Sequence, residues 1–113
     1  MKIFTYIILF FAFAFSIHAQ ELNIVPALKM IEAGDINSAQ KELTKLKNSA
    51  SDEPSVIFLD AVLTENGESA LNKYLKVYKE HPNSKYADAA LFRIFSYYYS
   101  LGVYKRAQSL LDE

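Results

Sequence analysis

Hydrophobic residues in the second half of the chain recur every three or four positions. Between positions 86 and 99 one hydrophobic stripe runs through positions 86, 87, 90, 91, 94, 95 and 98, and the charged residues Asp88 and Arg93 lie outside it. A similar pattern covers positions 70 to 78, where Asn72, Lys73 and Lys76 interrupt the hydrophobic set. This spacing places the hydrophobic side chains on one face of a helix, where a neighbouring helix can bury them. The pattern therefore predicts amphipathic helices, and no segment alternates as a half-buried strand would.

Proline and glycine divide the chain into segments of similar length. Proline occurs only at positions 26, 54 and 82, and glycine only at positions 34, 67 and 102. Glycine can end a helix in the left-handed conformation, and proline suits the first turn of a helix. Asn83 and Ser84 follow the last proline, and either side chain can cap a helix. Together these signals predict an all-α fold of six helices, at about 24–33, 36–48, 54–65, 68–80, 84–101 and 104–113.

A short motif recurs after each glycine. In each case an alanine is followed four positions later by a bulky residue, and the alanines lie 31 and 37 positions apart. A small residue lets two helices approach closely, and the bulky residue one turn later fills the space beside the crossing. A recurrence of about 34 residues is typical of a helical repeat. The three motifs are Ala39 with Leu43, Ala70 with Tyr74, and Ala107 with Leu111.

These positions resemble the tetratricopeptide repeat pattern across roughly residues 22–113. The third unit carries Leu91, Ile94 and Tyr98 before Ala107, and the second carries Pro82 twelve positions after Ala70. The first unit matches the pattern at Met30, Gly34, Ala39 and Leu43. Two departures from the pattern are Phe95, where the family has a small residue, and Ile57, Phe58 and Ala61 in the second unit. The resemblance implies an antiparallel helix-hairpin solenoid of about three units, wound as a right-handed superhelix.

The segment from Tyr74 to Phe92 has a narrower resemblance. It is similar to the extended repeats of periplasmic tetratricopeptide proteins, such as the Tol-Pal coordinator and outer-membrane assembly lipoproteins. This resemblance implies a scaffold that binds a protein or peptide partner in the bacterial cell envelope. It does not extend to lipidation, because the chain has no cysteine. As the alternative, the chain is the N-terminal repeat segment of a longer envelope or division protein that binds peptidoglycan through a sporulation-related domain.

Residues 1–19 have the features of a secretory signal peptide. Lys2 precedes a hydrophobic run from Ile3 to Ile17, and Ala19 is a small residue at which a signal peptidase can cut. The run is shorter than the roughly 20 residues that cross a bilayer as a helix. We therefore expect cleavage before Gln20, export to the periplasm or medium, and a mature repeat domain at 20–113. An uncleaved N-terminal anchor is the alternative.

Composition and charge exclude several functions. The 113 residues contain 12 Lys and Arg against 13 Asp and Glu, which gives a net charge of −1. A nearly neutral chain has no broad cationic field for phosphates, so we expect no nucleic-acid partner. The absence of cysteine excludes disulfides, thiol nucleophiles and thiolate metal sites. We expect membrane contact only during export.

The sequence offers little for catalysis. Beyond position 19 the only histidine is His81, in a predicted turn, and no phosphate loop, zinc motif or serine elbow is present. Catalytic sites need convergent groups that exchange protons or attack a substrate. We therefore expect a protein that is not an enzyme and that holds no cofactor or metal.

Exposed residues of the third unit are the candidate partner-binding site. Tyr97, Tyr98 and Tyr99 point about 100° apart on a helix, so they cannot share one face. Tyr99 falls on the side where tetratricopeptide arrays present their concave surface, together with Phe92 and Ser96. The preceding unit would extend this surface through Leu59 and Val62. The alternative is that these side chains only pack against neighbouring helices.

The last predicted helix ends the sequence without a polar capping helix. Each hairpin of a solenoid leaves a hydrophobic face for its neighbour. Two interpretations remain open: the chain continues beyond Glu113, or another chain covers the last face through self-association.

Overall fold

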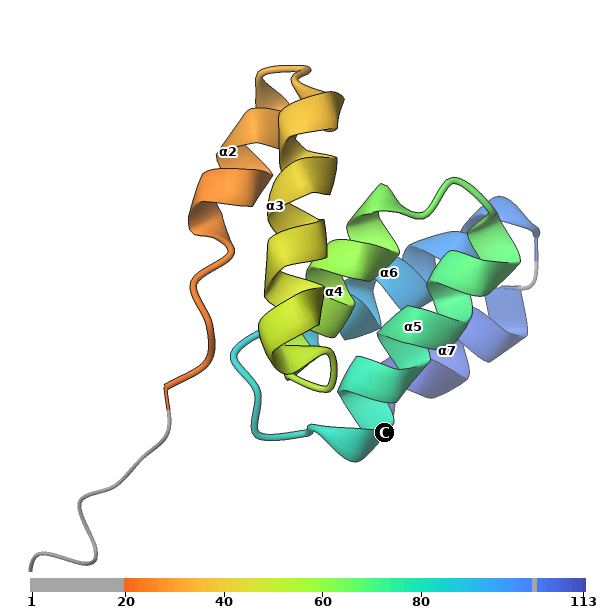
Figure 1. The fold of residues 1–113 in the computed structure, drawn as a ribbon. Coiled ribbons are helices and arrows are strands. Elements are labelled where there is room, and N and C mark those ends of the chain that lie inside the picture. Colours follow the sequence, from red (N-terminus) through yellow and green to blue (C-terminus); the bar gives the residue numbers. More distant parts are fainter. Residues whose placement is uncertain (1–19, 103) are drawn as a thin grey trace, which may run out of the picture.

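The computed structural model describes residues 20–102 and 104–113, except the side chains at positions 104 and 107. The described residues form helices and no strands (Figure 1). The all-α prediction is confirmed, and every helix boundary lies within three residues of its predicted position. The helices, labelled as in Figure 1, are α2 (Val25–Glu32), α3 (Ile36–Ala50), α4 (Pro54–Leu63), α5 (Gly67–Glu80), α6 (Ala87–Ser100) and α7 (Tyr104–Leu111).

Two of the three glycines act as predicted at helix ends. Gly34 follows α2 and Gly102 follows α6. Their φ angles are 81° and 75°, in the left-handed region that residues with a side chain rarely adopt. Gly67 does not end α4 but is the first residue of α5. Asn66 caps the N-terminus of α5, because its side chain accepts a hydrogen bond of 2.9 Å from the Ser69 N–H.

Helix α6 begins three residues later than the sequence predicts. The Ser84 hydroxyl does not cap the helix as expected, because it accepts a hydrogen bond from the Tyr86 N–H at 3.1 Å within the preceding turn. The same hydroxyl donates to a carboxylate oxygen of Glu21, and Glu21 also accepts from the Lys85 N–H at 3.2 Å. This loop is therefore held by the segment before α2, which is distant in sequence.

Each helix packs mainly against the next helix along the chain. The helices α2 and α3 form an antiparallel pair at one end of the molecule, and α7 lies at the other end (Figure 1). The connections between consecutive helices are short, and short connections favour antiparallel packing of the two helices that they join. In the described part of the molecule, the helices are therefore packed in the order in which they follow one another along the chain.

Helix α4 supplies more of the buried hydrophobic residues than any other described helix. Its buried residues include Val56, Phe58 and Leu59, and its hydrophobic residues are spread around the helix instead of forming one stripe, as expected for a helix that packs between two others. The Phe58 ring lies 5.7 Å from that of Tyr74 and 5.0 Å from that of Tyr86, measured between ring centroids. Phe58 therefore joins α4 to α5 and to the loop before α6.

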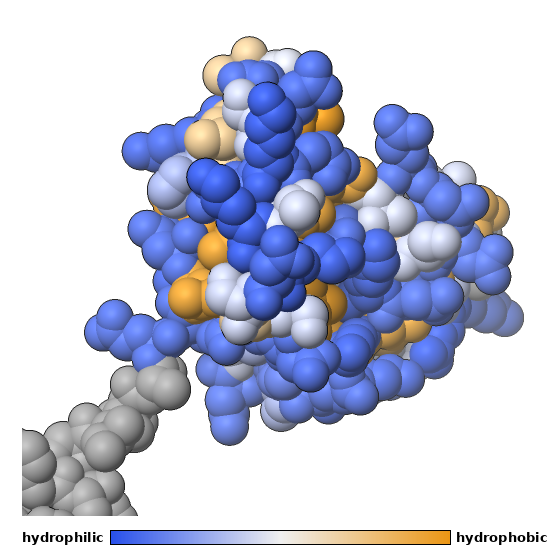
Figure 2. Space-filling model, viewed as in Figure 1, coloured by the Kyte–Doolittle hydropathy of each residue, from blue (hydrophilic) through white to orange (hydrophobic). Residues whose placement is uncertain are grey.

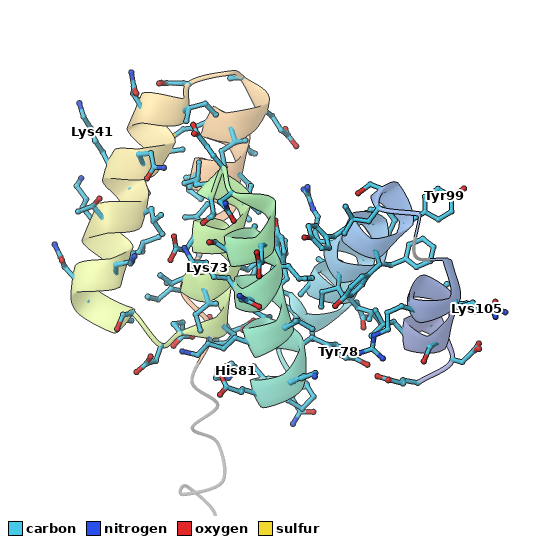
Figure 3. All side chains as sticks on the ribbon, turned by 90° about the vertical axis from the view of Figure 1, so that its right-hand side faces the viewer. Lys41, Lys73, Tyr78, His81, Tyr99 and Lys105 are labelled. Atoms are coloured by element: carbon cyan, nitrogen blue, oxygen red, sulfur yellow. The ribbon has the colours of Figure 1, made fainter. Side chains whose placement is uncertain are left out.

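One acidic residue links three helices at the edge of this core. Asp60 on α4 lies 3.3 Å from the ammonium of Lys47 on α3 and 3.1 Å from that of Lys73 on α5. The Lys73 ammonium also donates to the Thr64 hydroxyl oxygen at 2.9 Å. Figure 3 labels Lys73 on α5, beside α4. We refer to Asp60, Lys47, Lys73 and Thr64 as the Asp60 cluster.

The predicted repeat-packing residues divide into three groups. Ala39, Leu43, Tyr74 and Ile94 are buried as expected. Ala70, Leu91 and Tyr98 are half-buried. Pro82 and Leu111 are exposed, and Pro82 lies in a turn. The prediction for Leu111 is wrong, since its residue surface is 61% exposed while that of Leu110 is 1% exposed. Successive helical residues point about 100° apart, so burying Leu110 against α6 turns Leu111 outward. The side chain of Ala107 lies outside the described residues.

The predicted signal peptide at residues 1–19 also lies outside the described residues. Among the helices that the structure does describe, none combines the length and hydrophobicity needed to cross a membrane.

Candidate functional site

Helix α6 carries two large aromatic side chains on an exposed side. Phe92 is 66% exposed and Tyr99 is 56% exposed. They are seven residues apart, which is about two helical turns, so they point to the same side of the helix. The opposite side holds the buried residues Ala87, Ala90 and Ile94. Helix α6 is thus anchored along one side and offers aromatic surface on another.

Two of the residues between Phe92 and Tyr99, Phe95 and Ser96, complete the surface. The half-buried Phe95 ring stacks on the Tyr99 ring with 5.9 Å between centroids, a favourable aromatic contact. The Ser96 hydroxyl donates to the Phe92 carbonyl at 2.9 Å. Figure 3 shows Tyr99 at the end of α6. We define the aromatic face of α6 as Phe92, Phe95, Ser96 and Tyr99.

The structure corrects the predicted extension of this surface onto α4. Leu59 has no exposed surface and belongs to the core, so it cannot contact a partner. Val62 is half-buried and packs against the same core. The physical reason is that α4 packs between α3 and α5, so most of its hydrophobic residues face other helices. The candidate surface is therefore confined to α6.

The three consecutive tyrosines point in different directions, as helical geometry predicts. Tyr98 is half-buried against the core and has the Arg106 guanidinium 6.0 Å above its ring. The Tyr97 ring meets that of Tyr98 edge-on at 5.7 Å between centroids. Tyr99 alone of the three is mainly exposed.

A groove lies between α5 and α6, next to the aromatic face. It has a volume of about 270 Å³, and Ser96 belongs to both surfaces. Sequence reasoning missed this groove, although small residues at positions 67 and 70, one turn apart on α5, were a visible signal. We call it the α5–α6 groove; its lining residues are Gly67, Ala70, Leu71, Tyr74, Arg93, Ser96 and Tyr97.

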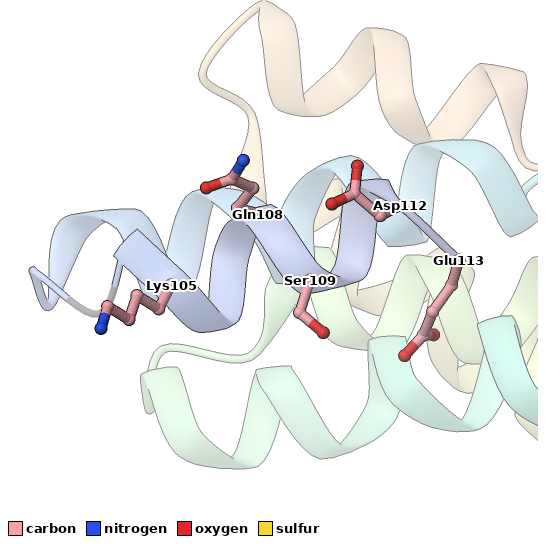
Figure 4. A pocket seen from close by; sticks show the side chains of 5 residues that line it. All are labelled: Lys105, Gln108, Ser109, Asp112 and Glu113. Atoms are coloured by element: carbon pink, nitrogen blue, oxygen red, sulfur yellow. The ribbon is translucent and has the colours of Figure 1, made fainter.

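Two further hollows are polar. The hollow on α7 is lined by five side chains from this helix and the two residues after it (Figure 4). No second helix encloses it, so it lacks the walls of a ligand site. The other hollow lies where Glu21 meets the loop before α6 and includes Glu53, Glu80 and His81. Its hydrogen bonds from the loop to Glu21 already give this hollow a structural role.

Two tyrosine hydroxyls have raised pKa values, and the described residues include no metal-binding cluster. Within 20–102 and 104–113, no group of three or more His, Asp or Glu residues could hold a metal ion. Burial raises the pKa of the Tyr74 hydroxyl, and the positive charge of Arg93 lowers it in part. Burial also raises the pKa of the Tyr86 hydroxyl, and the negative charge of Glu21 raises it further. Both hydroxyls are therefore poorer acids than an exposed tyrosine and suit hydrogen bonding.

The surface in the view of Figure 2 is mainly hydrophilic, with small hydrophobic areas between polar side chains. Exposed aromatic residues that share one side of a helix can mark an interaction site. Comparisons of the chain with known protein families, with curated proteins and with solved structures find no match.

The fold and the surface together describe an all-α protein with exposed aromatic residues on one side of α6.

Proposed function

We propose that the protein is an exported, tetratricopeptide-like scaffold that binds a protein or peptide partner in the bacterial cell envelope. The observation that carries the proposal is the aromatic face of α6, with Phe92 and Tyr99 exposed on the same side. Aromatic side chains of this kind are enriched among the residues that dominate binding energy at interfaces. The partner would bury both rings.

The size of the aromatic contribution supports binding. Complete burial of a Phe side chain is worth about 1.5–3 kcal/mol. A micromolar dissociation constant corresponds to about 8 kcal/mol of binding free energy, so burial of Phe92 and Tyr99 can supply part of that free energy. The stacking of Phe95 on Tyr99 restrains the Tyr99 ring before binding. A restrained ring loses less conformational entropy when a partner covers it.

The packing order of the helices supports a repeat architecture. Consecutive helices pack together, and Ala39, Leu43, Tyr74 and Ile94 are buried at positions where the repeat pattern needs contacts. In this proposal the pairs α2–α3, α4–α5 and α6–α7 are the three hairpins of a solenoid. The exposed Leu101 and Leu111 lie near its last hairpin and are candidates for self-association.

Export rests on the sequence of residues 1–19. The hydrophobic run after Lys2 and the small residue Ala19 are typical of a cleaved signal peptide. We propose that the mature protein begins at the exposed Gln20. Mass spectrometry of the protein purified from its host tests this: a mature N-terminus at Gln20 supports export with cleavage, and an intact Met1 contradicts it.

We further propose that the protein works without catalysis and without a cofactor. Its contribution is to hold another envelope protein in place, which requires surface complementarity and no reacting groups. The aromatic face supplies the hydrophobic contact, and the Ser96 hydroxyl and the neighbouring groove supply polar groups at its edge.

Site-specific photo-crosslinking of the full chain in its host tests the proposal. A benzophenone amino acid at position 92 is expected to give a discrete adduct with one partner. The matched control places the same amino acid at Ile36, which is an exposed hydrophobic residue on α3. The proposal predicts that Tyr99→Ala weakens the adduct at position 92, while circular dichroism is unchanged. Equal adducts at positions 36 and 92, or none at 92, would contradict a binding role for α6.

A further inference from the structure

The α5–α6 groove has two distinct ends. At one end, a Cβ atom placed on Gly67 would lie 3.2 Å from the Tyr97 ring, so the ring packs close to the place where any other residue would carry a side chain. At the other end, Tyr74 on α5 and Arg93 on α6 both line the groove, and the positive charge of Arg93 partly offsets the rise that burial causes in the pKa of the Tyr74 hydroxyl. Between the ends, Ala70 and Leu71 supply an apolar lining.

Arg93 is the only charged residue of the groove lining. It is exposed, and it forms no ion pair with any carboxylate of the part of the chain that the structure describes. Its situation differs from that of Lys47 and Lys73, whose ammonium groups both pair with Asp60. A guanidinium offers two parallel N–H donors that match the two oxygens of a carboxylate. The groove therefore combines an apolar hollow with an unpaired cation.

We propose that the α5–α6 groove binds an extended peptide segment of the partner through an acidic side chain on Arg93 and an apolar side chain over Ala70 and Leu71. This inference deepens the proposed function and rests on it, because it names the chemistry of the partner. Ser96 lies in both the groove and the aromatic face, so one partner can cover the two surfaces together.

The helical rise sets the spacing of the two peptide side chains. Ala70 and Tyr74 are four residues apart on α5, which corresponds to about 6 Å along the helix axis. In an extended peptide, residues two positions apart project to the same side and lie roughly 6.5–7 Å apart. The segment that fits therefore has an apolar residue and an Asp or Glu two positions apart, and the probe below carries them in one of the two possible orders.

Both side chains are needed for binding. An ion pair between exposed groups is weak in water, because solvent and salt screen it. A small apolar contact in an open groove is also weak without a group that fixes its position. The combination makes binding depend on the acid, on the apolar residue and on their separation.

Titration of the isotopically labelled full chain with short peptides tests the inference by nuclear magnetic resonance. The probe is acetyl-Gly-Leu-Ser-Glu-Gly-amide, which carries the proposed spacing. Comparison peptides replace Glu with Gln, replace Leu with Ala, or place Glu directly after Leu. A fourth comparison, acetyl-Gly-Leu-Ser with a free C-terminal carboxylate, distinguishes an acidic side chain from a chain terminus.

We expect the probe to shift the backbone amide signals of Gly67, Ser96 and Tyr97. Replacing Glu with Gln in the probe, or Arg93→Gln in the protein, should weaken binding by about two- to fivefold, as expected for loss of an exposed ion pair. Ala70→Leu fills the hollow and should also weaken binding. Lys105→Gln removes the same charge from the exposed α7 surface, shown in Figure 3, and should leave the affinity unchanged.

Several outcomes would overturn the inference. These are equal binding of the Glu and Gln peptides, an unchanged affinity of the Arg93→Gln protein, tighter binding of the free-terminus peptide, and no shift with any peptide. Arg93 is exposed, so its Gln variant is expected to fold even if Ala70→Leu does not. Crosslinking at position 92 is measured separately. A persistent adduct with no peptide binding would refute the groove inference alone, while loss of that adduct would refute the proposed function.

Discussion

Removal of the Asp60 carboxylate is expected to weaken the attachment of α4 to both neighbouring helices. Asp60→Asn keeps the size of the side chain and removes its charge. In the folded protein this carboxylate contacts Lys47 at 3.3 Å and Lys73 at 3.1 Å, and its side chain is 21% exposed. The substitution therefore breaks two charged contacts without leaving a cavity.

The magnitude follows from the exposure of the three groups. Ion pairs at the surface contribute about 0.2–1 kcal/mol each, and partial burial places these two toward the upper end of that range. The side chains of Lys47 and Lys73 are 48% and 35% exposed, so Lys73 should contribute more. We expect Asp60→Asn to lower the free energy of unfolding by about 1–2 kcal/mol. For a domain of this size that loss lowers the melting temperature by about 5–10 °C.

Urea unfolding followed by circular dichroism measures this change. The matched control is Asp52→Asn, because Asp52 also faces a lysine, Lys76, but at 3.9 Å and with its side chain 94% exposed. The control should unfold like the original protein. A double-mutant cycle between Asp60→Asn and Lys73→Met should show coupling that falls with added salt. Equal stability of the Asp60→Asn protein, or coupling that salt does not change, would refute the reasoning.

Three further predictions concern stability. Ser55→Ala is expected to raise the free energy of unfolding by about 1 kcal/mol in urea titrations, because the Ser55 hydroxyl is fully buried with no hydrogen-bond partner among the described residues; a clear loss would show a missed partner. Leu59→Ala should cost about 2–5 kcal/mol by the same assay, while Phe92→Ala should change stability by less than about 0.5 kcal/mol; similar losses would contradict the assignment of Leu59 to the core and Phe92 to the surface. The Asp35 pKa lies below its usual value of 3.8 because its carboxylate accepts hydrogen bonds from Ser38, so its stabilising contribution is present near neutral pH and is lost as the pH falls through the lowered pKa. Asp35→Asn should therefore lose less stability than the original protein between about pH 5 and pH 2, and parallel pH profiles would count against this effect.

The helices could be predicted from the sequence because their signals are local. Hydrophobic spacing of three and four residues, with glycine and proline between segments, gave boundaries close to those of the structure. The largest error was the start of α6. There the Ser84 hydroxyl bonds to Glu21, which is 63 positions away, and no local pattern contains that contact.

The burial of individual residues was harder to predict where hydrophobic residues are continuous. The hydrophobic residues of α4 are spread around the helix, so periodicity could not tell that Leu59 faces the core. Leu110 and Leu111 are adjacent, and the repeat resemblance selected the one that is exposed. In both cases the packing of neighbouring helices decides the outcome, and a helix pattern alone does not contain it.

The two candidate binding surfaces follow from the division of α6 into three sides. Ile94 lies on the side that packs into the core, Phe92 and Tyr99 lie on the aromatic side, and Arg93 and Tyr97 face the groove with α5. Since the core side is fully buried, it holds the other two sides at a fixed angle. A partner segment that contacts both surfaces must therefore cross α6 near Ser96, which belongs to both. A bulky substitution such as Ser96→Trp should disturb peptide binding in the groove and crosslinking at position 92 together, whereas Arg93→Gln should affect the groove more strongly.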